Sequence, residues 1–201
     1  MKTLFRDHSY NMVKMFLNQF ATAIFGFSLA LAAGKAESYT LRNATSIAAI
    51  LFYLFLLYTM SWELGFKERI GILHGRIKNQ PYKGFLISLF ANIPNFLFAI
   101  FIMLAALLPK SSFFGSLGAF GKSAALILEG MYTGILAHPI GGTQLNRMWL
   151  MYFLITVPAI LISGIAYLFG TKDIKFTSLT THEYPESDRA PKRKKGGGED
   201  D

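Results

Sequence analysis

Four long stretches of the chain contain no charged residue, and the charged residues gather in the segments between them. These stretches hold 20, 20, 26 and 24 residues and lie between Lys14 and Lys35, Arg42 and Glu63, Lys83 and Lys110, and Arg147 and Lys172. A helix that crosses the hydrocarbon core of a bilayer needs about 20 mostly apolar residues. The pattern therefore predicts an all-α fold, that of a polytopic helical membrane protein.

Proline and tryptophan positions add detail to the predicted spans, which cover about residues 12–33, 44–64, 84–108 and 148–169. Trp62 ends the second span and Trp149 begins the fourth, where aromatic anchors at the membrane interface are typical. Pro94 lies in the first half of the third span. Because proline removes a helical hydrogen bond and crowds the preceding turn, we expect a kink near Asn92.

The segment 111–146 is harder to assign than the four spans. Its most apolar part, residues 123–137, is 15 residues long and contains Glu129, so it is short and polar for a span. We expect a partly inserted or re-entrant segment. The alternatives are a fifth transmembrane helix and a helix that lies on the membrane surface.

The distribution of Lys and Arg favours four spans over five. With four spans, 15 of the 20 Lys and Arg residues lie on the side of both termini, and 5 lie opposite. Five spans give 9 and 11. If only Lys172 and Lys175 are counted from the tail, the ratios become 10 to 5 and 9 to 6. Cytoplasmic segments carry an excess of these residues, so we expect a multi-pass cell-membrane protein with both termini in the cytoplasm.

Residues 66–78, between the second and third spans, have the pattern of a helix that lies in the headgroup region. Four apolar side chains at helical spacing form one stripe: Phe66, Ile70, Leu73 and Ile77. Cationic side chains flank or follow it, and we expect them to contact anionic lipid headgroups: Lys67, Arg69, Arg76, Lys78 and Lys83. The alternative is a solvated loop, because Gly71 and Gly75 weaken a helix here.

The composition narrows the classes of function. Apolar residues make up 52% of the chain and charged residues 16%, and the absence of cysteine excludes disulfides, thiolate metal sites and cysteine nucleophiles. The four histidines lie in separate segments and no catalytic motif is found, so we predict no metal, no cofactor and no enzymatic activity. We attribute the net charge of +8 to the bias of Lys and Arg toward one membrane face, and we do not expect nucleic acid as a partner.

A few polar side chains at membrane depth form a predicted intramembrane polar site. Glu129 comes first, because an ionisable residue in a membrane segment is costly and indicates function. Inside the bilayer its carboxyl group would favour the protonated form, whereas on the surface it would face water. Asn92 and Asn95 share a face beside the kink, and Asn18 and Gln19 lie in the first span. Such amides line substrate paths or join helices by hydrogen bonds.

The C-terminal tail, residues 171–201, is charged and poor in apolar residues. Such a segment cannot bury a core, so we predict that it is disordered. Its basic cluster Lys192–Lys195 is followed by three glycines and an acidic end. We expect the tail to be solvated, with binding of anionic lipid headgroups or RNA by the basic cluster as the alternatives.

The sequence thus predicts a non-enzymatic integral membrane protein, an accessory or scaffold subunit of a membrane assembly. The small residues Gly26, Ala30 and Gly34 would let another helix approach closely, in this chain, in a membrane protein partner or in a homo-oligomer. The alternative is a small oligomeric transporter or channel that uses Glu129 and the kink at Asn92 and Asn95. A membrane enzyme is the third hypothesis. The first two differ in whether Glu129 is inserted and faces a polar cavity.

Overall fold

The computed structural model describes residues 2–35 and 38–174, and most of them belong to helices. The elements in chain order are α1 (Lys2–Lys35), α2 (Tyr39–Leu73), α3 (Lys83–Ala91), α4 (Ile93–Leu107), α5 (Ser112–Leu128), η1 (Gly130–Tyr132), α6 (Thr133–Leu136), β1 (Pro139–Ile140), β2 (Thr143–Gln144), η2 (Leu145–Arg147), α7 (Trp149–Leu154) and α8 (Val157–Thr171). The predicted all-α class is confirmed.

The long helices have the length and composition of membrane spans. Within the described part of the chain, α1, α2 and the pair α7–α8 are each long and apolar enough to cross a bilayer, and the bent pair α3–α4 makes a fourth if it is one span. Large apolar side chains cover their outer faces, including Leu51, Phe55 and Leu161, which are 62%, 61% and 50% exposed. Extended apolar surfaces of this kind indicate a membrane location.

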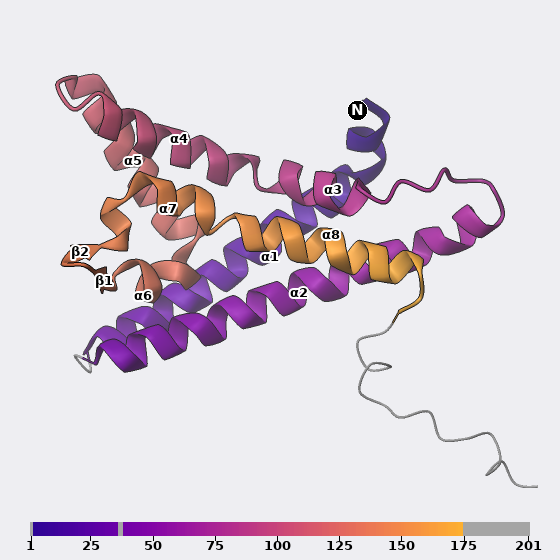
Figure 1. The fold of residues 1–201 in the computed structure, drawn as a ribbon, viewed down its shortest axis with the longest axis horizontal. Helices are drawn as coiled ribbons and strands as arrows, with labels where there is room; N and C mark the ends of the chain where they lie inside the picture. Colours follow the sequence, from indigo (N-terminus) through magenta and orange to yellow (C-terminus); the bar gives the residue numbers. More distant parts are fainter. Residues whose placement is uncertain (1, 36–37, 175–201) are drawn as a thin grey trace, which may run out of the picture.

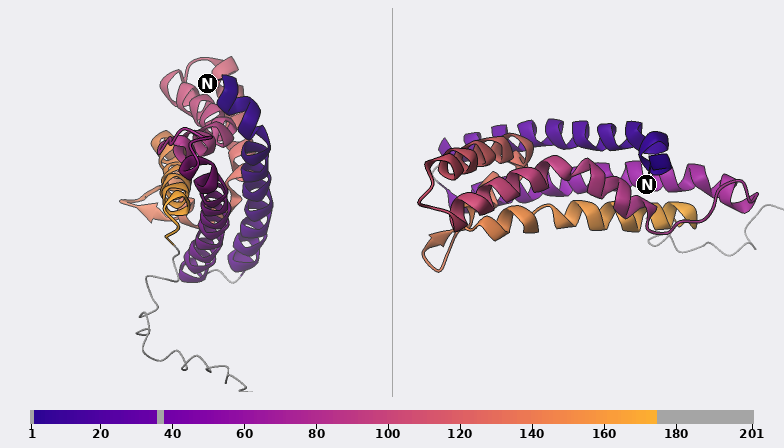
Figure 2. Two further views of the ribbon diagram at one scale, coloured as in Figure 1. Left: turned by 90° about the vertical axis from the view of Figure 1, so that its right-hand side faces the viewer. Right: turned by 90° about the horizontal axis from the view of Figure 1, so that it is seen from above.

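The chain runs back and forth between the two ends of an elongated bundle (Figure 1). The start of α1, the loop between α2 and α3 and the end of α8 lie at one end, which we call the terminal end. The end of α1, the turn between α4 and α5 and the β1–β2 hairpin lie at the other, the hairpin end. Figure 2 shows α1, α2 and α8 running beside one another along the bundle.

The third span bends where the sequence predicts a kink. Helix α3 ends at Ala91 and α4 begins at Ile93, and their axes differ by 56°. Pro94 occupies the first turn of α4, where the missing N–H of proline has no helical partner to lose. The predicted kink near Asn92 is therefore confirmed, and it makes one bent element of α3 and α4.

The predicted interfacial helix over 66–78 is corrected by the structure. Helix α2 continues without a break from the second span to Leu73, so most of this stretch is the end of a long helix. Gly75 then adopts a φ of +67°, and the N–H groups of Arg76 and Ile77 both donate to the Gly71 carbonyl. Glycine after the last helical turn is a common helix terminator because it tolerates the left-handed conformation. Residues 74–82 form a connection to α3.

The segment after α4 enters the bundle and then reverses. Helix α5 runs antiparallel to α4, since Gly118 lies against Ala105 and Gly121 against Phe98. Past Leu128 the chain turns back toward the hairpin end through η1 and α6 (Figure 1).

A short antiparallel hairpin closes this segment. Pro139 pairs with Gln144 and Ile140 with Thr143, and the two-residue turn between them is Gly141-Gly142, with φ angles of +59° and +82°. Both glycines adopt positive φ, as the preferred two-residue hairpin turns require.

Candidate functional site: a polar pocket around Glu129

Small residues allow the reversing segment to lie directly on α1 and α2. A Cβ atom on Gly26 would meet the backbone of Met131, and one on Gly130 would meet the Ala23 carbonyl. The N–H of Gly134 donates to Ser46 Oγ over 2.9 Å, which fixes the segment to α2. The segment that carries Glu129 is thus packed into the bundle interior, not on its outer surface.

Glu129 lies at the point of reversal and is only 4% exposed. Thr156 Oγ1, at the junction of α7 and α8, donates to Glu129 Oε1 over 3.2 Å. Among the described residues Glu129 forms no ion pair. A buried carboxyl group without a cationic partner is costly to keep ionised, so these surroundings favour its neutral form.

Three buried tyrosines surround this carboxyl group. Tyr53 on α2, Tyr132 in η1 and Tyr152 on α7 are 2%, 6% and 6% exposed. All three are close enough to Glu129 to interact with it electrostatically. The Tyr132 hydroxyl is buried without a hydrogen-bond partner among the described residues. The surroundings of Glu129 therefore contain hydroxyl groups from three different elements.

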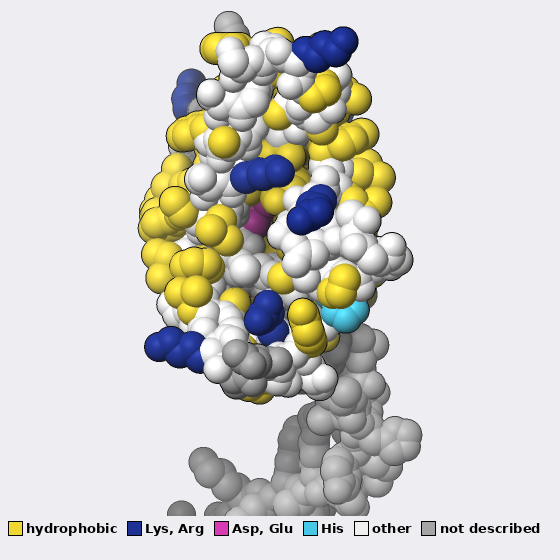
Figure 3. Space-filling model, turned by 90° about the vertical axis from the view of Figure 1, so that its left-hand side faces the viewer, with side chains coloured by type: hydrophobic (Ala, Val, Ile, Leu, Met, Phe, Trp, Pro, Cys, Tyr) yellow, Lys and Arg dark blue, Asp and Glu magenta, His cyan; other side chains and the backbone are white. Residues whose placement is uncertain are grey.

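A pocket of about 390 Å³ leads from the hairpin end to Glu129. Space-filling Figure 3 views this end: Lys and Arg side chains lie on either side of a hollow, and an acidic side chain is visible at its bottom. The lining includes polar residues from α5, α6, β2, η2 and α7: Lys122, Glu129, Thr133, Gln144, Asn146, Arg147 and Tyr152. The volume falls in the range of small-molecule sites.

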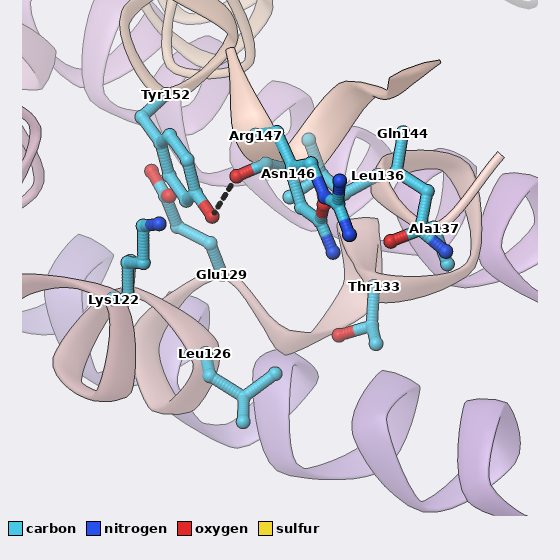
Figure 4. Close-up of a pocket in the computed structure, with 11 residues that line it drawn as sticks. Lys122, Leu126, Glu129, Thr133, Leu136, Ala137, Gln144, Asn146, Arg147 and Tyr152 are labelled. Carbon is cyan, nitrogen blue, oxygen red and sulfur yellow. Dashed lines mark hydrogen bonds between the residues drawn. The ribbon is translucent and has the colours of Figure 1, made fainter. Parts of the chain in front are cut away.

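The close-up in Figure 4 shows how the charged side chains lie in this pocket. The Lys122 amine and the Glu129 carboxyl group point toward each other beside the Tyr152 ring. Tyr152 is held in place because its hydroxyl donates to the Asn146 carbonyl over 3.2 Å. Lys122 and Arg147 are exposed, whereas Glu129 is buried. Positive charge thus lies toward the mouth of the pocket and a titratable acid at its base.

The two asparagines of the predicted site are buried beside the kink, but their hydrogen bonds are local. Asn92 Nδ2 donates to the Ser88 carbonyl over 2.8 Å, and Asn95 Nδ2 donates to Asn92 Oδ1 over 2.9 Å. Neither bond joins α3–α4 to another helix. Asn95 Oδ1 is buried without a partner among the described residues. These contacts favour a role at the kink over the joining of helices.

The amides of the first span contact other elements. Gln19 Nε2 donates to the Leu128 carbonyl over 3.0 Å, and this carbonyl directly precedes Glu129. Asn18 Nδ2 lies 3.6 Å from the Met60 sulfur on α2. Gln19 therefore supports the reversal that positions Glu129, while Asn18 joins α1 to α2.

A second buried acid, missed by the sequence analysis, lies at the terminal end. Glu68 Oε1 accepts from Lys83 Nζ over 2.7 Å and lies 3.5 Å from His8 Nε2, and Glu68 Oε2 accepts from the Tyr167 hydroxyl over 2.6 Å. These four residues, which we call the ionic cluster, belong to α2, α3, α1 and α8 and are at most 8% exposed. The cluster joins four helices.

The residues predicted to contact lipid headgroups have different surroundings. Lys67, Arg76 and Lys78 are exposed, and Lys67 pairs with Glu63 over 2.6 Å. Arg69 forms an ion pair with Asp173. The prediction for Lys83 is corrected, because its charge is buried against Glu68 and does not reach a headgroup.

The C-terminal tail from residue 175 onward, with its predicted disorder and basic cluster, lies outside the described residues. In the described part of the chain, no group of three His, Asp or Glu side chains is arranged to hold a metal ion. No family model, curated protein or solved structure matches this chain.

Proposed function

We propose that this protein is a small membrane transporter that carries a small anionic solute together with a proton bound to Glu129. One observation carries the proposal. A carboxyl group that is 4% exposed, and forms no ion pair among the described residues, lies at the base of a pocket of about 390 Å³. An ionisable group in this position is a functional site by default.

The charges that line the pocket supply a mechanism for coupling. Lys122 and Arg147 attract an anionic group, such as a carboxylate or a phosphate, at the mouth. An ionised Glu129 at the base would repel that anion, whereas protonation removes the repulsion. Anion binding and proton binding therefore favour each other, and this coupling is reciprocal. The solute and the proton would therefore bind to the pocket together.

The accessory-subunit hypothesis loses part of its support in this structure. One observation in its favour is the series of small residues Gly26, Ala30 and Gly34, which would let a helix of a partner protein approach closely. Gly26 instead packs on Met131 of the same chain, and Ala30 is only 6% exposed. Among the described residues, only the Arg42 guanidinium lies near the position of a Cβ atom on Gly34. The transporter is thus the better supported of the two hypotheses.

The proposal includes four spans with α5 to α6 as a re-entrant segment, both termini in the cytoplasm and the pocket open to the opposite side. The path of the chain supports this topology, since the start of α1 and the end of α8 lie at one end of the bundle (Figure 1). Exposed Lys67, Arg76 and Lys78 would then meet anionic lipids of the cytoplasmic leaflet. A reporter fused after Thr171 that is active only on the external side would contradict it.

Proton-coupled uptake into proteoliposomes tests the function. The full chain is reconstituted with a pH-sensitive dye inside, and external lactate or inorganic phosphate serves as the anionic probe. We expect one of the two to acidify the interior. Glu129→Gln should abolish acidification, while Glu63→Gln, on the outer face of α2, should retain it.

The mouth residues give an independent test of the binding step. Lys122→Gln and Arg147→Gln each remove one cation that faces the pocket, so we expect weaker binding of the active anion and a higher concentration for half-maximal acidification. Lys67→Gln, which removes a cation at the terminal end, is the matched control. If no anion drives acidification, or if Glu129→Gln behaves like the wild type, the proposed function is wrong.

A further inference from the structure

The ionic cluster and the Glu129 pocket lie at two depths of the same bundle. Tyr53, which is close to Glu129, and Glu68 both face inward on α2 and are 15 residues apart. At 1.5 Å per residue this separation is about 22 Å, most of the thickness of a bilayer core. A proton on Glu129 therefore needs a route through the protein to reach the terminal end.

Buried polar side chains occupy the interior between these two acids. They belong to α2, to the bent pair α3–α4 and to the pair α7–α8, and all are at most 4% exposed: Ser61, Ser88, Asn92, Asn95, Thr156 and Ser163. We call these six residues the polar row. An apolar side chain at any of these positions would satisfy the packing of a membrane bundle, because helices in lipid need no polar interior to associate.

Hydrogen bonds connect three members of the polar row directly, namely Asn95, Asn92 and Ser88, and the other members lie near them without a bond between their side chains. Thr156 donates to Glu129 at one end. On α3 and α4, Asn95 Nδ2 donates to Asn92 Oδ1 over 2.9 Å, and Asn92 Nδ2 lies 3.4 Å from Ser88 Oγ. Ser88 and Ser163 both donate to the Ala159 carbonyl, over 3.3 Å and 2.8 Å. Ser163 lies one helical turn before Tyr167, which donates to Glu68.

Three buried oxygen atoms along this route have no hydrogen-bond partner among the described residues: Tyr132 Oη, Asn95 Oδ1 and Ser61 Oγ. Tyr132 lies beside Glu129, Asn95 lies at the kink, and Ser61 lies two turns before Glu68 on α2. Buried polar groups of this kind are normally satisfied, and internal water is the usual partner where protein groups are lacking. These oxygen atoms could therefore form hydrogen bonds with water molecules that relay protons.

We propose that the polar row conducts protons between Glu129 and the ionic cluster, which makes the cluster the group that exchanges protons with the terminal side. The inference rests on the proposed function of Glu129 and adds the path by which its proton leaves. In each transfer Glu129 gives up one proton to the relay, and the relay gives one proton to Glu68 or to water beyond it, so that charge is conserved.

Different groups surround the two ends of the relay. Glu68 meets His8 from α1, Lys83 from α3 and the Tyr167 hydroxyl from α8. Glu129 accepts from Thr156 and lies near the hydroxyl groups of Tyr53 on α2, Tyr132 in η1 and Tyr152 on α7, and the cations Lys122 and Arg147 line the same pocket. Both faces of the membrane are therefore connected to Glu129, one through the pocket and one through the row.

Labelling by dicyclohexylcarbodiimide, which modifies protonated carboxyl groups in apolar surroundings, tests this double connection. The full chain is placed in vesicles sorted for one orientation, and the initial rate of Glu129 labelling is read by mass spectrometry. The pH is lowered on one side at a time. We expect a several-fold rise in the labelling rate from either side in the wild type.

Variants of the polar row distinguish proton access to Glu129 through the row from proton access through the pocket. Asn95→Leu replaces an amide by an apolar side chain of similar size, and Ser61→Ala removes a hydroxyl, so both should lose the response to terminal-side pH and keep the response to pocket-side pH. Ser123→Ala, whose exposed hydroxyl bonds only within α5, is the matched control and should keep both.

The outcomes distinguish the two proposals. If wild-type labelling follows only the pocket-side pH, the proton path is wrong while the proposed function stands. If Asn95→Leu and Ser61→Ala both keep the terminal-side response, the protons do not use the polar row. If the rate of Glu129 labelling does not change with the pH on either side, both the proposed function and the proton path are wrong.

Discussion

Glu129 and Glu68 are both acidic residues buried in the same bundle, 4% and 7% exposed, yet they differ in their hydrogen-bond and ionic partners. Glu68 has a lysine at 2.7 Å, a tyrosine hydroxyl at 2.6 Å and a histidine at 3.5 Å. Glu129 accepts one hydrogen bond from a threonine at 3.2 Å and opens on a pocket. Burial alone therefore does not determine what a buried acidic residue does.

The partners decide the role of each acid. A buried ion pair with further hydrogen bonds holds its charges in a fixed geometry, and loss of one partner leaves the other uncompensated. A buried acid without a cation has a neutral form of comparable stability, so it can change its charge with pH or with a bound ligand. The ionic cluster thus stabilises four helices, whereas Glu129 is suited to carry a proton.

The largest expected effect concerns the ionic cluster. Glu68→Gln leaves the Lys83 ammonium buried without its counter-charge, and we expect a loss of about 3–5 kcal/mol in the free energy of unfolding. The measurement is unfolding of the purified protein in detergent, followed by circular dichroism. Glu68→Gln combined with Lys83→Met removes both charges and should recover most of the loss.

Glu63→Gln is the matched control for this prediction. Its partner Lys67 is exposed, and exposed ion pairs contribute about 0–1 kcal/mol. If Glu63→Gln and Glu68→Gln lower the free energy of unfolding equally, the buried pair contributes no more to stability than the exposed one.

The next effect concerns the contact that places Glu129. Gly130→Ala puts a methyl group against the Ala23 carbonyl and Phe27, and overpacking of this kind costs about 1–3 kcal/mol. Gly115→Ala meets no atom within 4 Å, so we expect a gain from helix propensity. The same unfolding experiment should give opposite signs for the two variants. A stable Gly130→Ala protein would contradict the tight packing of η1 on α1.

A smaller effect is expected at the hydrogen bond between Thr156 and Glu129. Thr156→Val keeps the shape and removes the donor, and a single bond of this kind contributes about 0.5–1.5 kcal/mol. Loss of this hydrogen bond should also shift the pH at which Glu129 is labelled by carbodiimide, because residue 156 no longer stabilises the ionised carboxylate. An unchanged titration would show that Thr156 has no influence on the charge of Glu129.

The spans and the kink follow from the sequence, because length and hydropathy are local properties. The bounds of α3–α4 and of α7–α8 lie within one or two residues of the predicted third and fourth spans. The kink depends on Pro94, which acts on its own turn. The topology from Lys and Arg counts stays a prediction, although the path of the chain places the start of α1 and the end of α8 at one end (Figure 1).

The ionic cluster could not be predicted from the sequence in the same way. Whether Lys83 meets a headgroup or Glu68 depends on which helix lies beside it, and this is a tertiary property. A signal for Glu68 did exist, because it lies on the face of its helix opposite Ile70 and Leu73, and charged groups of membrane helices face the interior.

Two further features have local signals. Gly75 marks the end of α2, and the pair Gly141-Gly142 is typical of a two-residue hairpin turn. The hairpin was missed because its strands are only two residues long.

An infrared titration of the protonated carboxyl band in the reconstituted protein tests most directly whether Glu129 carries the proton. We expect a band that persists toward neutral pH in the wild type and in Glu63→Gln and disappears in Glu129→Gln. If the band is the same in Glu129→Gln as in the wild type, Glu129 is not the proton carrier and the proposed function is contradicted.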